Sequence, residues 1–198
     1  MINTPPSHHR RSIRLKGYDY TSEGGYFITL VTHERQNLFG VVENDEMHLN
    51  PLGGIARDEW FRTAQLRSYV ELFDDEFIVM PNHIHGIIWI TGFVEAYCNT
   101  PLPNNTPSPN NTPLPDKPLE SMPFRSPGIG IGAIIRGYKS AVTKRINLLS
   151  HTPSTPVWQH NYYEHIITTD REYNAIAEYI YYNPYNWGAD EENLSSGM

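Results

Sequence analysis

The chain has 198 residues, of which 39% are hydrophobic and 12% aromatic, which is the composition of a globular protein with one substantial core. The formal net charge of -7 argues against nucleic-acid binding through overall charge, and the single cysteine, Cys98, excludes an internal disulfide and a multi-cysteine zinc site. No uncharged apolar stretch approaches the ~20 residues of a membrane helix, and the N-terminus lacks the apolar core of a signal peptide, so we expect a cytoplasmic protein without a membrane partner.

The first predicted segment, residues 1–16, is a basic arm that precedes the first acidic residue of the chain. Its cluster of positive charge is either a solvated surface or a patch that binds phosphate groups. The candidates for phosphate contacts in this arm are Arg10, Arg11 and Arg14.

A strand, a hairpin and a helix are predicted next. Aromatic and β-branched residues indicate a strand within 24–35, and 38–50 predicts a hairpin that turns at Asn44-Asp45. In residues 51–68 apolar side chains recur at helical spacing, which predicts an amphipathic helix with one buried face. That face carries Ile55, Trp60 and Phe61.

Two further strands are predicted on either side of Pro81-Asn82, over residues 69–81 and 83–92. The tandem copies of a proline-rich hexapeptide in 99–116 cannot join a helix or a central strand. We therefore interpret residues 93–126 as a disordered Pro/Asn/Thr-rich insertion that splits one domain spanning 17–187, and 188–198 as an acidic tail.

After the insertion, residues 131–149 predict a helix with a core face and a basic face. The core face consists of Ile134, Ile135, Tyr138, Val142 and Ile146. The basic residues Arg136, Lys139 and Lys144 are candidates for phosphate contacts, because this part of the chain contains no acidic residue.

The last predicted elements are a strand or hairpin within 155–169 and a helix that follows it. Thr169 and Glu172 have the spacing of a capping box at the start of this helix, and Pro184 ends it at or near Asn183. The order β-α-β-β-α-β, with one more helix, predicts an α+β fold: a ferredoxin-like or RRM-like antiparallel sheet with helices packed on it.

Two histidines interrupt the apolar run of the strand over residues 83–92. Because residues i and i+2 of a strand point to the same face, His83 and His85 project together, and Gly86 leaves space beside them. Imidazole is the commonest protein metal ligand, so the pair is either half of a metal site or a pair of structural residues.

The helix after Thr169 can supply the remaining groups. Tyr179 and Asn183 stand one turn apart, so a phenol and a carboxamide oxygen could both face the histidine strand. Two imidazoles, an amide oxygen and water molecules suit a divalent ion such as Mg²⁺ or Mn²⁺.

Two separated motifs resemble those of a known family. "MPNHIHGII" is similar to the His-hydrophobic-His motif of the single-tyrosine transposases of small bacterial insertion sequences, and "YIYYNP" resembles the tyrosine motif of the REP-associated tyrosine transposases. The segments "IIRGYKSAVTKRIN" and "VWQHNYYEH" are similar to that family in content and order. The resemblance extends from about Ile13 to Trp187, without the Pro-rich insertion.

The resemblance implies an RRM-like fold and a nuclease that attacks single-stranded or hairpin DNA with a tyrosine. It implies Tyr179 as the nucleophile and His83, His85 and Asn183 as ligands of Mg²⁺ or Mn²⁺. The expected function is therefore a transposase-like endonuclease and strand transferase that forms a 5′-phosphotyrosine, in DNA transposition or the processing of REP-type hairpins, as a monomer or homodimer.

Several alternatives stay open at this point. The chain could be an RRM-like module that binds DNA without cleaving it, or a metal-dependent phosphohydrolase in which the histidine pair activates water. Tyr162 and Tyr163 could stack on a base or fill the core, and Trp158 and Gln159 could be core residues or contacts to a DNA hairpin.

Overall fold

The computed structural model describes residues 22–92, 130–190 and 192–193. The basic arm with Arg10, Arg11 and Arg14 and the Pro-rich insertion lie outside these residues, so the predictions made for them stay predictions. Within the described segments, no helix combines the length and the apolar character that crossing a membrane requires.

Seven strands and three α-helices make up the described part of the chain. The strands are β1 (Gly24–Val31), β2 (Gly40–Glu43), β3 (Glu46–Leu49), β4 (Val70–Glu71), β5 (Phe77–Val79), β6 (His83–Ile90) and β7 (Tyr163–Ile167). The helices are α1 (Pro51–Leu66), α2 (Ile131–Leu149) and α3 (Asp170–Tyr182), with short 3₁₀ turns at His33–Arg35, Asp74–Glu76 and Trp187–Ala189.

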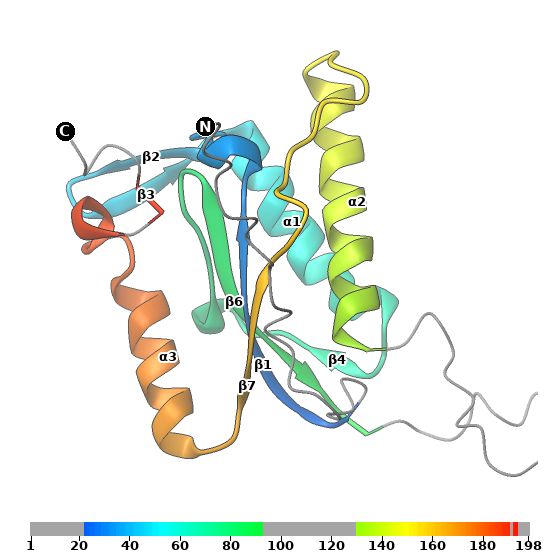
Figure 1. The fold of residues 1–198 in the computed structure, drawn as a ribbon, viewed down its shortest axis with the longest axis vertical. Coiled ribbons are helices and arrows are strands. Elements are labelled where there is room, and N and C mark those ends of the chain that lie inside the picture. Colours follow the sequence, from blue (N-terminus) through cyan, green and yellow to red (C-terminus); the bar gives the residue numbers. More distant parts are fainter. Residues whose placement is uncertain (1–21, 93–129, 191, 194–198) are drawn as a thin grey trace, which may run out of the picture.

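The main sheet is antiparallel and has the strand order β4-β6-β1-β7, with β5 also paired to β6. Helices α1 and α2 lie side by side on one face of this sheet, whereas α3 lies on the other face (Figure 1). The β2–β3 hairpin forms a separate two-stranded sheet. This arrangement confirms the predicted α+β fold with an antiparallel sheet covered by helices.

The two faces of the sheet have cores of different size. On the side of α1 and α2, alternate residues of β1 and β6 join one large apolar cluster, among them Ile28 and Ile84, which are fully buried. On the side of α3 the buried cluster consists of Phe27, Ile87 and Ile180. Partly buried apolar residues, among them Tyr173 and Ile176, pack around it, so α3 is attached to the sheet by a smaller apolar cluster than α1 and α2.

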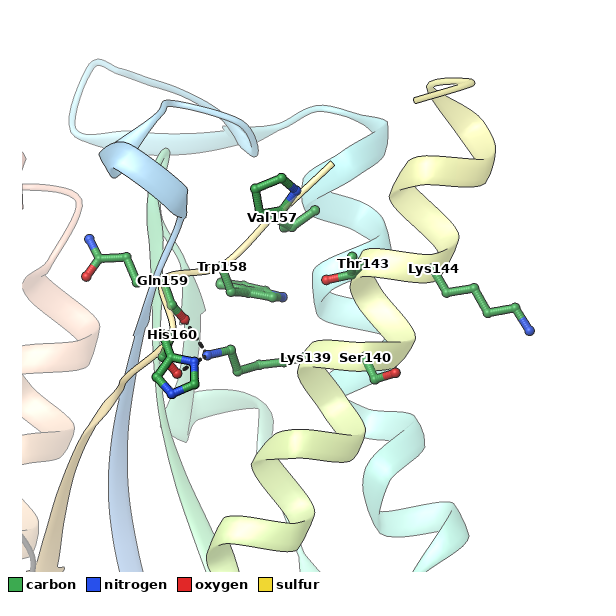
Figure 2. A pocket seen from close by; sticks show the side chains of 9 residues that line it. Lys139, Ser140, Thr143, Lys144, Val157, Trp158, Gln159 and His160 are labelled. Carbon is green, nitrogen blue, oxygen red and sulfur yellow. Dashed lines mark hydrogen bonds between the residues drawn. The ribbon is translucent and has the colours of Figure 1, made fainter. Parts of the chain in front are cut away.

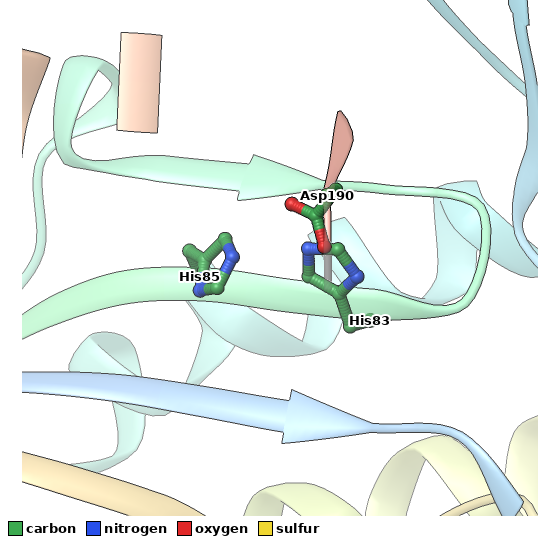
Figure 3. A group of neighbouring side chains, drawn as sticks. All are labelled: His83, His85 and Asp190. Carbon is green, nitrogen blue, oxygen red and sulfur yellow. The ribbon is translucent and has the colours of Figure 1, made fainter. Parts of the chain in front are cut away.

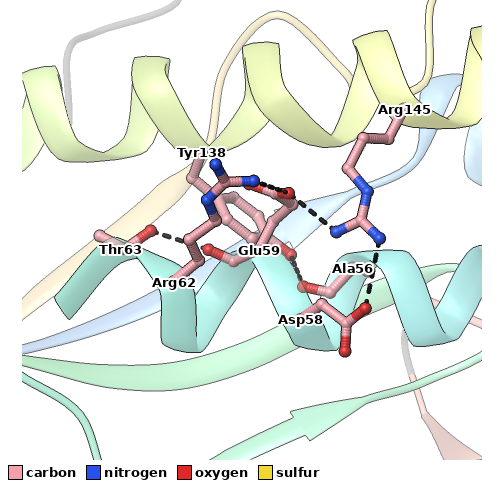
Figure 4. A network of polar contacts seen from close by, with 7 residues as sticks. All are labelled: Ala56, Asp58, Glu59, Arg62, Thr63, Tyr138 and Arg145. Carbon is pink, nitrogen blue, oxygen red and sulfur yellow. Dashed lines mark hydrogen bonds and ion pairs between the residues drawn. The ribbon is translucent and has the colours of Figure 1, made fainter. Parts of the chain in front are cut away.

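An ion-pair network joins α1 to α2 (Figure 4). The buried carboxylate of Glu59 accepts a hydrogen bond from Arg145 Nη1 at 2.8 Å, and Arg145 also pairs with Asp58 at 3.3 Å. The Tyr138 hydroxyl donates to the backbone oxygen of Ala56 at 3.0 Å. Arg145, one of the basic residues of the segment after the insertion, is thus paired within the fold.

The local signals at turns and caps predicted the structure well. Asn44 and Asp45 form the hairpin turn with φ values of 53° and 64°, in the left-handed region that Asn and Asp tolerate. Thr169 caps α3, since its hydroxyl oxygen accepts a hydrogen bond from the backbone N–H of Glu172 at 3.2 Å. The predicted core face of α2 is buried along its whole length.

Three predicted strands were too long. The first ends at Val31 and the last begins only at Tyr163, while the segment predicted over 69–81 is divided by the 3₁₀ turn Asp74–Glu76. That turn buries the Glu76 carboxylate, which accepts hydrogen bonds from Trp89 Nε1 at 2.7 Å and from the Tyr173 hydroxyl at 2.8 Å. These long-range partners override the local strand preference.

Gly86 leaves space on the opposite face from the one predicted. A Cβ atom built on Gly86 would lie 2.5 Å from Trp60 Cζ2, so the missing side chain makes room for α1 rather than for the histidines. The Trp60 ring stacks there on Phe77, with ring centroids 4.6 Å apart.

Candidate active site

His83 and His85 project from β6 toward the side of the sheet that α3 covers. Both are buried, with exposed fractions of 0% and 3%, and their ring centroids lie 4.5 Å apart. Ile84 between them points into the core under α1 and α2. The alternation of strand side chains thus separates the histidine pair from the apolar residues of the same strand.

Each imidazole is oriented by a hydrogen bond to its Nδ1 atom. Asn82 Oδ1 lies 2.8 Å from His83 Nδ1, and Thr29 Oγ1 lies 2.9 Å from His85 Nδ1. Thr29 stands directly opposite His85 in the β1–β6 register, so the sheet itself fixes this contact. Both rings are left with Nε2 turned toward α3, which is the arrangement that outer partners give to metal-binding histidines.

Burial keeps both imidazoles neutral. It lowers the pKa of His83 to about 4, against the opposing effect of the nearby Asp190 carboxylate. It also lowers the pKa of His85 well below the ordinary value, and the neighbouring His83 acts in the same direction. Since a histidine must be neutral to bind a metal ion, the rings are prepared for this role at neutral pH.

Helix α3 brings Tyr179 and Asn183 to the histidines. The Tyr179 hydroxyl lies 3.1 Å from His85 Nε2, and the Tyr179 side chain is 44% exposed. Asn183 is 1% exposed, and its Oδ1 atom is buried without a hydrogen-bond partner, as is His83 Nε2. The residues that the sequence proposed for one site therefore do lie together, and the two unpaired acceptor atoms fit a bound cation.

Asp190 also belongs to this group, although the sequence analysis placed it in the acidic tail. Ligand atoms of His83, His85 and Asp190 lie within 4.8 Å of one another (Figure 3). Asp190 Oδ2 accepts a hydrogen bond from Asn183 Nδ2 at 3.2 Å. The signal that could have identified Asp190 is a carboxylate only seven residues after Asn183, just past the end of the tyrosine helix.

A cavity of about 550 Å³ opens beside these groups. Its lining residues are Phe27, Thr29, His85, Tyr163, Tyr179, Asn183, Asn186, Ala189, Asp190 and Glu192. Tyr163 is 42% exposed and meets the Phe27 ring edge-on, with centroids 6.1 Å apart, whereas Tyr162 packs against the main core. The structure thus separates the two neighbouring tyrosines: Tyr163 faces the cavity and Tyr162 does not line it.

The two tyrosines that follow Tyr179 in α3 point elsewhere. Tyr181 and Tyr182 contact each other edge-on and are 72% and 48% exposed. Neither lines the cavity that contains the Tyr179 hydroxyl.

Four of the predicted DNA-binding residues meet at a second cavity, of about 490 Å³, between α2 and the segment before β7 (Figure 2). They are Lys139, Lys144, Trp158 and Gln159. Lys144 extends into solvent. Lys139 instead donates hydrogen bonds to the backbone oxygens of Gln159 and His160, and burial lowers the pKa of Lys139.

Trp158 is only 7% exposed and packs on Phe39 and Tyr138, so it is mainly a core residue. Arg136 is exposed and does not line this cavity.

Comparison with known proteins identifies a relative that is similar in sequence and a solved structure that shares the fold. No family model matches the chain. A protein of Haemophilus influenzae, described only as uncharacterized, is 41% identical over 184 residues, which cover 93% of each chain.

Among solved structures, a REP-associated tyrosine transposase bound to a REP hairpin superposes with a TM-score of 0.52 at 19% identity, over 91% of this chain and 77% of the other. A putative transposase from Deinococcus radiodurans R1 gives a TM-score of 0.38 at 16% identity, over 84% of this chain and 94% of the other. The first of these shows that the chain has the fold of a tyrosine transposase, as its motifs predicted.

Proposed function

We propose that this chain cuts and rejoins single-stranded DNA. The premise is that it belongs to the family of the Haemophilus influenzae protein and has the fold of a REP-associated tyrosine transposase. The observation that carries the proposal is the Tyr179 hydroxyl, which reaches His85 Nε2 at 3.1 Å at the wall of an open cavity. A buried histidine pair, a half-exposed phenol and a space for substrate are the parts that such a reaction requires.

The proposed reaction is a transesterification at a DNA phosphate. The Tyr179 hydroxyl gives up its proton and its oxygen forms a bond to phosphorus, while the bond from phosphorus to the 3′ oxygen breaks. The leaving oxygen takes up one proton, equivalent to the one that the phenol lost, and becomes a 3′-hydroxyl. The product is a 5′-phosphotyrosine. Because the energy of the phosphoester is retained, a 3′-hydroxyl can later attack this linkage and rejoin the DNA without ATP.

The phenol is a weak nucleophile until it loses its proton. A pKa near ~10 means that deprotonation at pH 7 costs about 4 kcal/mol, so the site must offset this cost. A divalent ion held by His83 and His85, with Asn183 beside them, would polarise the scissile phosphate and balance the negative charge that develops on its oxygens. Mg²⁺ and Mn²⁺ are the candidate ions for a site that binds phosphate.

The remaining residues of the cavity suit a single-stranded substrate. Tyr163 and Phe27 form an aromatic wall next to Tyr179, and an unpaired base can stack on an exposed aromatic ring. The solved transposase with this fold is bound to a REP hairpin, which supports hairpin DNA as the substrate here. Lys144, with Arg136 on the same helix, would contact the phosphates of that DNA.

The test uses labelled single-stranded and hairpin DNA, the full chain and Mn²⁺ or Mg²⁺, followed by denaturing electrophoresis. We expect a covalent protein–DNA adduct that Tyr179→Phe reduces to background. Tyr181→Phe is the matched control, because this tyrosine lies on the same helix but does not line the cavity, and it should retain the adduct.

Two results would contradict the proposal and favour the alternatives. DNA binding without cleavage by the wild-type protein would indicate an RRM-like binding module. Cleavage without an adduct, unchanged in Tyr179→Phe, would indicate a phosphohydrolase in which the histidine pair activates water.

A further inference from the structure

We infer that Asp190 is the third protein ligand of the ion, and that the site is built for a first-row transition ion such as Mn²⁺ rather than for Mg²⁺. This inference rests on the proposed function only for the presence of an ion between the histidines. The motif resemblance assigned the third position to Asn183, whereas the structure brings a carboxylate into the same group.

The geometry permits Asp190 to bind an ion together with both histidines. One carboxylate oxygen of Asp190 and one ring nitrogen of each histidine lie within 4.8 Å of one another, which groups these atoms as candidate ligands of one ion (Figure 3). His83 Nε2 is buried without a hydrogen-bond partner. The strand thus offers the unpaired His83 Nε2 atom, next to His85, at the place to which the chain after α3 delivers the Asp190 carboxylate.

Asp190 is held in place by the same residue that orients His83. Asn82, which is fully buried, turns its Oδ1 atom toward His83 Nδ1 and donates from Nδ2 to the backbone oxygen of Glu192 at 2.7 Å. The backbone N–H of Glu192 in turn donates to Asp190 Oδ1 at 2.7 Å. A single side chain therefore fixes a histidine and the segment that carries the carboxylate, as expected of a preorganised metal site.

Among the residues that the structure describes, the lysine and arginine ion pairs do not include Asp190. Its hydrogen-bond donors there are the Asn183 amide and the Glu192 N–H, neither of which carries a charge. A partly buried anion in these surroundings is stabilised most by a bound cation.

Asn183 acquires a different role in this arrangement. Its Nδ2 group donates to Asp190 Oδ2 at 3.2 Å, which orients the carboxylate and turns its own Oδ1 atom into the site. We assign Asn183 as a positioning residue that orients the Asp190 carboxylate and does not itself bind the ion.

The donor set determines the class of ion. Two imidazole nitrogens and one carboxylate form a donor set that proteins use for first-row transition ions such as Fe²⁺ and for Zn²⁺, while Mg²⁺ prefers a shell of oxygen atoms. With two neutral histidines and one carboxylate, a divalent ion retains one net positive charge. That charge matches the single negative charge of a DNA phosphodiester.

The test measures metal binding directly, on the full chain freed of metal by a chelator. Calorimetric titration of the wild-type protein with Mn²⁺ and with Mg²⁺ should give tighter binding of Mn²⁺. We expect Asp190→Asn to weaken Mn²⁺ binding by at least about tenfold. Asp45→Asn removes the same charge at the exposed hairpin turn, where Asn tolerates the positive φ, and should bind Mn²⁺ like the wild-type protein.

A spectroscopic readout distinguishes a ligand from a positioning residue. The visible absorption of bound Co²⁺ depends on its donor atoms, so Asp190→Asn should change the spectrum, whereas Asn183→Ala should weaken binding but retain the wild-type spectrum. The inference is overturned if Asp190→Asn leaves both the Mn²⁺ affinity and the Co²⁺ spectrum unchanged, or if Asn183→Ala alone alters the spectrum. Such a result leaves the Tyr179 adduct intact, so it is distinguishable from failure of the proposed function.

Discussion

At the scale of single residues, the site depends on two imidazoles whose Nδ1 atoms are held by Asn82 and Thr29. His83 Nε2 is left without a hydrogen-bond partner, whereas His85 Nε2 faces the Tyr179 hydroxyl. Burial disfavours the protonated form of both rings, which lowers their pKa values below the ordinary histidine range.

The lowered pKa values predict a pH dependence of stability in metal-free protein. His83 has a pKa of about 4 in the fold and about 6.5 when unfolded, so the unfolded chain binds more protons between these values. The free energy of unfolding should therefore contain the full contribution of His83 above pH 6.5, and it should decrease by about 3 kcal/mol through this residue as the pH drops to 4. His85 acts in the same direction.

Urea unfolding in the presence of a chelator, at several pH values, measures this effect. His83→Gln should flatten the pH dependence, while His48→Gln, at an exposed position of β3, should leave it unchanged. An equal slope in His83→Gln and the wild-type protein would show that His83 is not buried as a neutral ring.

At the scale of elements, α3 must hold Tyr179 in place although its apolar contact with the sheet is small. The buried Glu76 carboxylate compensates for this, because it bonds to the Tyr173 hydroxyl of α3 and to Trp89 of β6. The same carboxylate raises the pKa of Tyr173 to about 12. Glu76 thereby anchors the N-terminal half of the helix whose C-terminal half carries Tyr179.

We expect Glu76→Ala to reduce the free energy of unfolding by about 1–3 kcal/mol, because it leaves two polar groups of Trp89 and Tyr173 without their acceptor. Tyr173→Phe removes one of these bonds and should cost about 1 kcal/mol. Asp74→Asn, which disturbs only the exposed pair with Arg57, should change stability by less than about 1 kcal/mol. Denaturant unfolding measures all three, and equal stability of Glu76→Ala and Asp74→Asn would exclude the anchoring role.

At the scale of the whole molecule, the sheet separates two surfaces. The candidate active site lies on the side of α3, while the cavity lined by Lys144 and Gln159 lies against α2 on the other side. The strand β7, at the edge of the sheet, connects them: Tyr163 begins it, and the segment that contains Gln159 precedes it. DNA held at one surface could thus present a single strand to the other across this edge.

This arrangement predicts that Lys144→Ala weakens DNA binding without altering the chemical step. Loss of one phosphate contact should reduce the slope of log affinity against log salt by about 0.7–1. Arg171→Ala, which removes an exposed basic residue from α3, is the control and should retain the wild-type slope. A filter-binding or fluorescence titration at several salt concentrations measures the slope, and equal slopes for both variants would exclude Lys144 from the DNA surface.

The sequence by itself determined what depends on neighbouring residues. Strand alternation placed His83 and His85 on one face, the capping box began α3 at the correct residue, and one helical turn placed Asn183 on the side of Tyr179. These features follow from local backbone periods of two and 3.6 residues, which a single segment encodes.

Only the tertiary structure decided which distant groups meet. It brought Asp190 to the histidines, paired Arg145 with Glu59, and turned Trp158 into the core and Glu76 toward α3. Each of these contacts joins segments whose approach depends on the packing of the whole sheet and its helices. The position of Asp190 shortly after the helix with Asn183 was a local hint, but its meeting with the two imidazoles depends on how the fold returns the chain to β6.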